Sequence, residues 1–222
     1  TLTNSASSII TFSGTVPTIT TLTATASSNT VQYTSTGAQT IKGTTYVNLT
    51  KSGAGGTATL GGTTNVNNNF TISSGTVDAD STNNYGLSVG GTWSNSGTFT
   101  PRQGTVTLTG TSTFSDTTSF YNFTINGSSI TVTLGAALDA DNNLTVTAGT
   151  LSAGSNGITV GNNFSNAGTF TSGTGTVTFN ATDTGNTITT GGSSFYNLTM
   201  NGVGGGWTLQ DATTVSNVLT IT

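Results

Sequence analysis

The sequence predicts an all-β fold and, within that class, a repetitive β-solenoid, also called a parallel β-helix. Composition is the first reason. The 222 residues include 56 Thr and 23 Asn but no Glu and three Lys+Arg, so strand formers are common and the usual helix formers are scarce. Short apolar and polar alternation is the second reason, and a phrase that recurs at constant spacing, starting at Tyr46, Tyr121 and Tyr196, is the third.

The recurring phrase defines the domain organisation that we expect. "YNFTINGSS" at 121–129 returns as "YNLTMNGVG" at 196–204 and, in a more divergent form, as "YVNLTKSGA" at 46–54. We therefore divide the chain into 75-residue repeats at 46–120 and 121–195 and a partial repeat at 196–222. Residues 29–45 read as the end of an earlier partial repeat, and residues 1–28 as an N-terminal segment and candidate donor or capping strand.

A shorter period lies inside the repeat. Apolar residues alternate in short bursts such as "NFTI", "NLTV" and "TVTF", which Gly, Asn, Ser or Asp separate, and this is typical of strands with one buried face. Phe123, Leu144 and Phe164 recur at a spacing of roughly 20 residues, which suits one solenoid coil. The 75-residue repeat would then make about three coils. Tandem β-sandwich modules remain the alternative fold.

Charge excludes several kinds of partner. Three basic side chains cannot form the positive surface that nucleic-acid binding or a polybasic membrane patch requires. No apolar run approaches the roughly 20 residues of a spanning helix. We expect no nucleic-acid partner and no membrane insertion in this segment. The chain has no Cys and hence no disulfide framework.

Asp residues are the only candidate ligands or catalytic groups in the sequence, and the composition argues against catalysis. Without His or Glu, the paired acid and base groups of hydrolytic sites are missing, so we predict that the chain is not an enzyme and needs no cofactor. Two "DAD" pairs place alternate Asp side chains on one side of a strand, where they could hold Ca²⁺. These candidate metal ligands are Asp78, Asp80, Asp139 and Asp141.

Three further motifs are ambiguous on sequence alone. Asn-x-Ser/Thr sites for glycosylation occur about as often as the composition predicts, at Asn48, Asn69, Asn122, Asn126, Asn143, Asn163, Asn180 and Asn197. Thr-x-Thr runs at 105–109 and 176–179 are candidates for an ice-binding surface, although Thr is common on any strand. Trp93 could stack on sugars, but it matches Phe164 in the repeat and so reads as core.

The phrase "NNFSNAGTFTSGTGTVTFN" at 162–180 resembles the β-strand-repeat surface proteins of bacteria and archaea, such as adhesins, stalks and haemagglutinin-like proteins. The resemblance implies a structural protein of the cell surface or a filament, located outside the cell and working by β-repeat extension and self-assembly as a homo-oligomer. The alternative is a carbohydrate-binding or Ca²⁺-dependent adhesion module whose partner is a surface polysaccharide. No functional residue is carried over from the resemblance.

Overall fold

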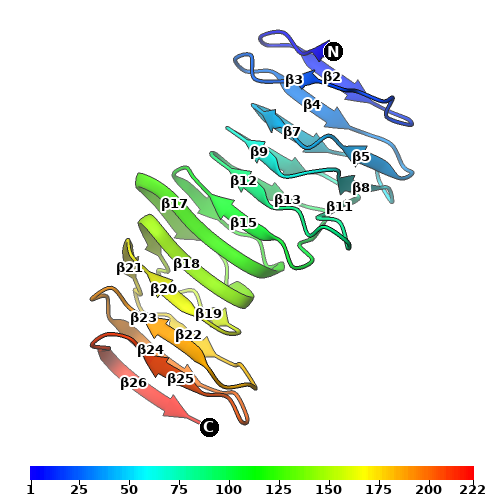
Figure 1. The fold of residues 1–222 in the computed structure, drawn as a ribbon. Helices are drawn as coiled ribbons and strands as arrows, with labels where there is room; N and C mark the ends of the chain where they lie inside the picture. The colour runs from blue at the N-terminus through cyan, green and yellow to red at the C-terminus, as the bar shows by residue number, and fades with distance from the viewer. The chain divides into compact units, whose positions relative to one another are not determined.

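The computed structural model describes residues 1–222 and confirms the β-solenoid (Figure 1). The chain makes about 11 turns, and each strand pairs in parallel with the corresponding strand of the next turn. It contains no helix, and so none that could cross a membrane. The tandem β-sandwich alternative is therefore wrong, because a sandwich is built from antiparallel sheets.

The chain divides into two compact units, Thr1–Thr107 and Leu108–Thr222. The strands of unit 1 are short. They are β1 (Leu2–Thr3), β2 (Ile9–Phe12), β3 (Leu22–Thr23), β4 (Thr30–Tyr33), β5 (Gln39–Ile41), β6 (Thr45–Tyr46), β7 (Asn48–Lys51), β8 (Thr57–Leu60), β9 (Thr64–Val66), β10 (Phe70–Ile72), β11 (Thr76–Asp78), β12 (Leu87–Val89), β13 (Trp93–Asn95) and β14 (Thr98–Thr100). Strand β15 (Thr105–Leu108) runs over the boundary.

Each coil of unit 1 has three faces, which we name in chain order. Face A consists of β6, β9 and β12, and face B of β2, β4, β7, β10 and β13. Face C consists of β5, β8, β11 and β14. Strands β1 and β3 form a separate parallel pair. One coil therefore runs from face A through face B to face C before the chain continues into the next coil.

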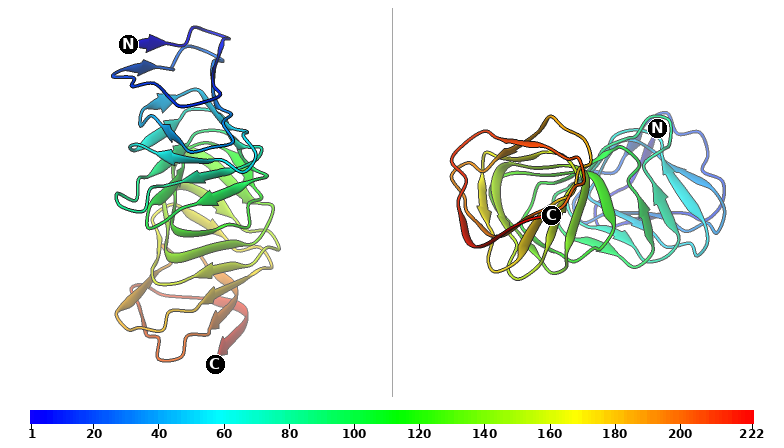
Figure 2. Two further views of the ribbon diagram at one scale, coloured as in Figure 1. Left: turned by 90° about the vertical axis from the view of Figure 1, so that its right-hand side faces the viewer. Right: turned by 90° about the horizontal axis from the view of Figure 1, so that it is seen from below.

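Unit 2 has the same three faces and two long strands. Its strands are β16 (Ser112–Phe114), β17 (Ser119–Leu134), β18 (Leu138–Ser152), β19 (Ile158–Val160), β20 (Phe164–Asn166), β21 (Thr169–Thr171), β22 (Thr176–Phe179), β23 (Asn186–Thr189), β24 (Phe195–Met200), β25 (Trp207–Leu209) and β26 (Val215–Ile221). Strands β17 and β18 bend through all three faces. Face A of this unit also contains β19, β22, β24 and β26, face B contains β20, β23 and β25, and face C contains β16 and β21. Figure 2 shows the coils from two further sides.

Inward side chains form continuous columns, which confirms the short period. Phe123 pairs with Leu144, and Leu144 with Phe164, so the three residues singled out in the sequence occupy the same place in successive coils. All three are buried. Alternation at period two sends their neighbours outward, which is why about half of each strand can be Thr, Ser or Asn without loss of core.

The long repeat does not equal a whole number of coils. On face A of unit 2, Leu138, Ile158, Val177 and Leu198 are successive column members, so three coils extend from Leu138 to Leu198. A 75-residue repeat is therefore longer than the three coils expected. As a result Phe123 lies in a face B column while its repeat partner Leu198 lies in the face A column.

What the copies of the repeated phrase share is a side-chain contact to the next coil. The Oδ1 atoms of Asn48, Asn122 and Asn197 each accept a hydrogen bond from the side-chain amide of an Asn one coil later, at 3.0, 2.9 and 2.8 Å. The donors are Asn68, Asn142 and Asn217. Stacked amides of this kind satisfy one another along a parallel stack. The repeated phrase therefore holds successive coils together.

Glycines stack at the corner between faces B and C. Gly149 has φ +83°, and a Cβ there would come within 2.6 Å of the Gly127 carbonyl oxygen in the preceding coil. Gly75 in unit 1 has φ +74°, and a Cβ there would collide with the Gly53 carbonyl oxygen. Only glycine allows both the left-handed backbone and this approach of coils. The chain therefore turns sharply at Gly75 and Gly149, and the next residue is already part of face C.

Candidate functional sites

The first Asp pair is occupied by interactions within the chain. Asp78 accepts two hydrogen bonds from Arg102, Nε to Oδ1 at 2.9 Å and Nη2 to Oδ2 at 2.6 Å. Asp80 Oδ1 accepts the backbone N–H groups of Thr82 and Asn83 at 2.9 and 2.7 Å. The Arg102 guanidinium lowers the pKa of Asp78, and the backbone donors lower the pKa of Asp80. These carboxylates cap a turn and anchor an arginine.

The second pair has a different electrostatic setting. Burial raises the pKa of Asp139, and the nearby charge of Asp141 raises it further. Ionisation of the Asp139 carboxyl is therefore costly at this place in the fold.

Asp141 opens onto a polar groove of about 340 Å³ that we did not predict from the sequence. Its wall includes Asp183, Asn162 and Asn180 from the following coils. Asp183 was missed because it has no second Asp two residues away. Coil register could have found the groove, since Asp141, Gly161 and Asn180 occupy corresponding places in successive coils. The structure shows no group of three or more His, Cys, Asp or Glu side chains placed to hold a metal ion.

The glycosylation motifs differ in how free their amide nitrogens are. Asn143 donates to Asn122 Oδ1 at 3.2 Å and accepts from Asn163 at 2.8 Å, so these motif residues belong to an amide ladder. Asn48 donates to the Asn29 carbonyl at 2.7 Å. Asn126 and Asn180 are exposed. A glycan on Asn48, Asn143 or Asn163 would have to replace an existing hydrogen bond, whereas Asn126 and Asn180 carry no such constraint.

Lys51 is a buried cation that we did not single out in the sequence. It points into the core of unit 1 from β7, and its Nζ donates to the carbonyl oxygens of Ser35 and Gly53 at 3.0 and 2.7 Å. Burial lowers its pKa. Carbonyl dipoles and not a carboxylate satisfy the ammonium group, so Lys51 ties neighbouring coils together at the corner between faces B and C.

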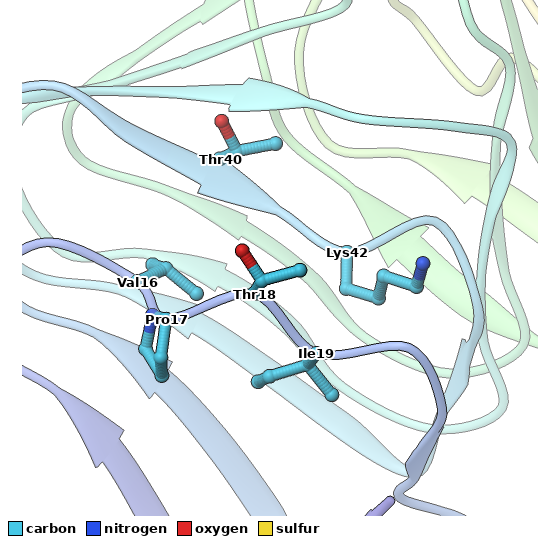
Figure 3. A pocket seen from close by; sticks show the side chains of 6 residues that line it. All are labelled: Val16, Pro17, Thr18, Ile19, Thr40 and Lys42. Atoms are coloured by element: carbon cyan, nitrogen blue, oxygen red, sulfur yellow. The ribbon is translucent and has the colours of Figure 1, made fainter.

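The aromatic side chains mostly build the core. Trp93 is 4% exposed and packs on Phe70 and Phe99, with ring centroids 4.8 and 5.1 Å apart, which confirms the core interpretation. An apolar hollow of about 220 Å³ lies in unit 1. Figure 3 shows Val16, Pro17 and Ile19 on one side of it and Thr40 and Lys42 on the other. It contains no acid and base pair, and it lacks an aromatic platform for a sugar.

Face C of unit 2 is the most regular outward surface. Strand pairing aligns Thr113, Thr133, Ser152 and Thr171 in one column. A second column two residues earlier holds Thr131, Thr150 and Thr169, and Thr111 precedes Thr131 there, since its Oγ1 accepts the Thr131 N–H at 3.1 Å. We call these eight residues the threonine array. The other seven hydroxyl groups make no hydrogen bond within the chain.

Face C of unit 1 has a related but interrupted surface. Thr59, Asp78 and Thr100 form one outward column, and Thr57, Thr76 and Thr98 form the other. The ion pair of Asp78 and Arg102 lies across it. The sequence motif Gly-Thr-x-Thr, with Asp or Ser in place of the last Thr in some coils, begins most strands of face C, but Ile130 replaces its Gly in one coil. The same motif begins strands of face A at 104–107 and 175–178, so strand pairing is needed to assign such a run to a face.

Comparison with known proteins finds no family, no curated protein and no solved structure that matches this chain.

Proposed function

We propose that this chain is a structural β-solenoid of the cell surface or of a filament, which works by stacking an open coil on coils of further copies. The observation that carries the proposal is the apolar surface of the coil formed by β25 and β26. Leu209, Leu219 and Ile221 are 54, 55 and 75% exposed, although Leu209 and Leu219 continue columns that are buried in the preceding coils.

The same coil offers unpaired backbone groups. Strands β25 and β26 each pair with one neighbour within residues 1–222, and their other edges can pair with a further coil, whether of more chain or of another copy. An apolar hollow of about 280 Å³ lies beside them, lined by Leu198, Met200, Trp207 and Leu219 among others. Such an edge is a template for further strands, and natural proteins usually block it with Lys, Pro or a bulge. Residues 207–222 contain neither Lys nor Pro.

The experiment compares association of the chain with that of two variants. Leu219→Asp with Ile221→Asp places charges in the stacking surface and should abolish concentration-dependent association in sedimentation and filaments in electron microscopy. Val203→Asp is the matched control, because Val203 is 88% exposed in a turn and should leave association unchanged. A wild-type chain that stays monomeric at all concentrations would refute the proposal.

A Ca²⁺-dependent or carbohydrate-binding adhesion module is the second candidate, and the polar groove beside Asp141 and Asp183 favours it. Paired carboxylates and amide oxygens are suitable ligands for Ca²⁺. This candidate predicts that Ca²⁺ raises the melting temperature, that chelator reverses the rise, and that Asp141→Asn abolishes it. An unchanged melting temperature with and without Ca²⁺ contradicts it.

A further inference from the structure

The threonine array has two regular repeat distances that its fold imposes. Adjacent coils place column members about 4.8 Å apart, and residues i and i+2 of one strand lie about 6.7 Å apart. Four coils contribute, each with two outward hydroxyl residues. The result is a two-dimensional grid of hydroxyl and methyl groups in two columns.

The grid is held firmly from beneath. The inward residues of the same strands include Phe114, Val132, Leu151 and Phe170, all buried. The outward side chains are also restricted, since β-branched Thr has few rotamers in a strand. The outward surface therefore keeps one shape in the absence of any partner.

The array also has unused hydrogen-bonding capacity and no charge. Six of its residues are exposed and the other two, Thr150 and Ser152, are half-buried. Elsewhere in unit 2, comparable hydroxyls are already bound: Thr187 to Asn163 at 3.0 Å and Thr190 to Asp211 at 2.9 Å. The array contains no Asp, Lys or Arg, so none of its side chains carries a charge that would orient water molecules around itself.

We propose that the threonine array is an ice-binding surface. The two distances of the grid are close to the distances at which oxygen atoms repeat on faces of hexagonal ice. Water molecules held between the two columns by hydroxyl groups and flanked by methyl groups would extend that lattice. A rigid grid orders these waters with little loss of conformational entropy, which is what recognition of a periodic solid requires.

Ice fits the array better than a polysaccharide does. Sugar rings are recognised by aromatic platforms and by convergent polar groups in a concave site. The array is a sheet surface, and the aromatic residues of its strands, Phe114 and Phe170, are buried in the core. The surface thus offers only hydroxyl and methyl groups in a lattice. This inference is independent of coil stacking, which uses β25 and β26.

The experiment measures ice growth with the full chain. The wild-type protein should shape ice crystals, lower the freezing point below the melting point and enter growing ice. Thr131→Tyr with Thr133→Tyr should remove all three effects, because two protruding rings keep the surface from meeting a flat ice face, while Tyr still suits a strand. Circular dichroism and melting temperature verify that the variant is folded.

The matched control is Thr178→Tyr on face A. Thr178 also points outward from a strand, but its neighbour column holds Asn197 and Val218, so the Thr-x-Thr pattern is not continued there. This variant should keep the full ice effect. Equal loss in the control and the array variant would show that the array is not the binding surface.

A second variant keeps the inference testable if the double substitution prevents folding. Ser152→Thr supplies the one methyl group that the array lacks and should increase the difference between freezing and melting points. An unchanged or smaller difference would count against the array. Wild-type protein that leaves ice growth at the buffer level, or that binds insoluble polysaccharide but not ice, overturns the proposal.

Discussion

Face C of unit 1 and face C of unit 2 begin at the same kind of glycine corner and bury the same kind of residue, yet they differ outward. In unit 1 the outward columns are interrupted by Asp78 and its partner Arg102, whereas in unit 2 all eight positions are Thr or Ser. The coil constrains what points inward and leaves the outward side free. The uniform surface of unit 2 is therefore not something that folding requires.

The largest expected effect tests the inward half of this comparison. Phe99→Ala in unit 1 and Phe170→Ala in unit 2 should each cost about 3–5 kcal/mol of stability, because each removes a buried ring beneath face C. The outward neighbour substitutions Thr98→Ala and Thr169→Ala should change stability by less than about 0.5 kcal/mol. Denaturant unfolding measures all four. Outward losses as large as the inward ones would break the comparison.

The next effect is a difference in pH dependence between the units. Asp78 has a lowered pKa, so its stabilisation is present above its unfolded value of about 3.9 and is lost as pH falls through the lowered folded value. Asp139 has a raised pKa, so its destabilisation is present at neutral pH and disappears as pH falls through that raised value.

Two substitutions measure this difference by thermal melts from pH 3 to pH 7. Asp78→Asn should lower the melting temperature at pH 7, with the difference from wild type fading in acid. Asp139→Asn should raise it at pH 7, and that difference should also fade in acid. Shifts of the same sign at pH 7 would mean that the electrostatic contrast between the two aspartates is wrong.

The smallest expected effect on stability comes from making unit 1 resemble unit 2. Asp78→Thr with Arg102→Asn removes a partly exposed ion pair, and such pairs contribute little once salt screens them. Asn is chosen because residue 102 has a left-handed backbone, with φ +53°, that Asn tolerates and Thr does not. The melting temperature in salt should barely change. The ice effect should increase, because both outward columns of face C in unit 1 then consist of Thr alone. No increase would restrict the inference to unit 2.

The coil could be predicted from the sequence, but its faces could not. Phe123, Leu144 and Phe164 revealed the coil length, since bulky inward residues recur wherever a column passes. Outward features depend on which residues of distant coils share a column, and the 75-residue repeat obscured that. The sequence therefore did not distinguish the Thr-x-Thr run at 176–179 from the runs that form the array. The structure places Thr176 beside Asn197 and not beside Thr.

Contacts across coils were the hardest to predict. Arg102 lies about one coil from Asp78 along the chain. The carbonyl groups that accept hydrogen bonds from Lys51 belong to the backbone, so no residue type in the sequence indicates them. The candidate Ca²⁺ ligands were chosen because they lie close together in the sequence. This criterion included Asp78 and Asp139 and excluded Asp183. In a solenoid, neighbours in space are residues about one coil apart, so sequence adjacency is a poor guide to sites.

The mismatch between the 75-residue repeat and the coil has a consequence for how such a chain evolves. Duplication of a repeat that is not a whole number of coils can move a copied side chain to another face, as Leu198 on face A and its counterpart Phe123 on face B illustrate. Copying whole repeats thus scatters a surface around the solenoid. A continuous grid on one face would instead evolve by insertion of single coils or by convergent point substitutions. Selection on such a surface would then act on one coil at a time.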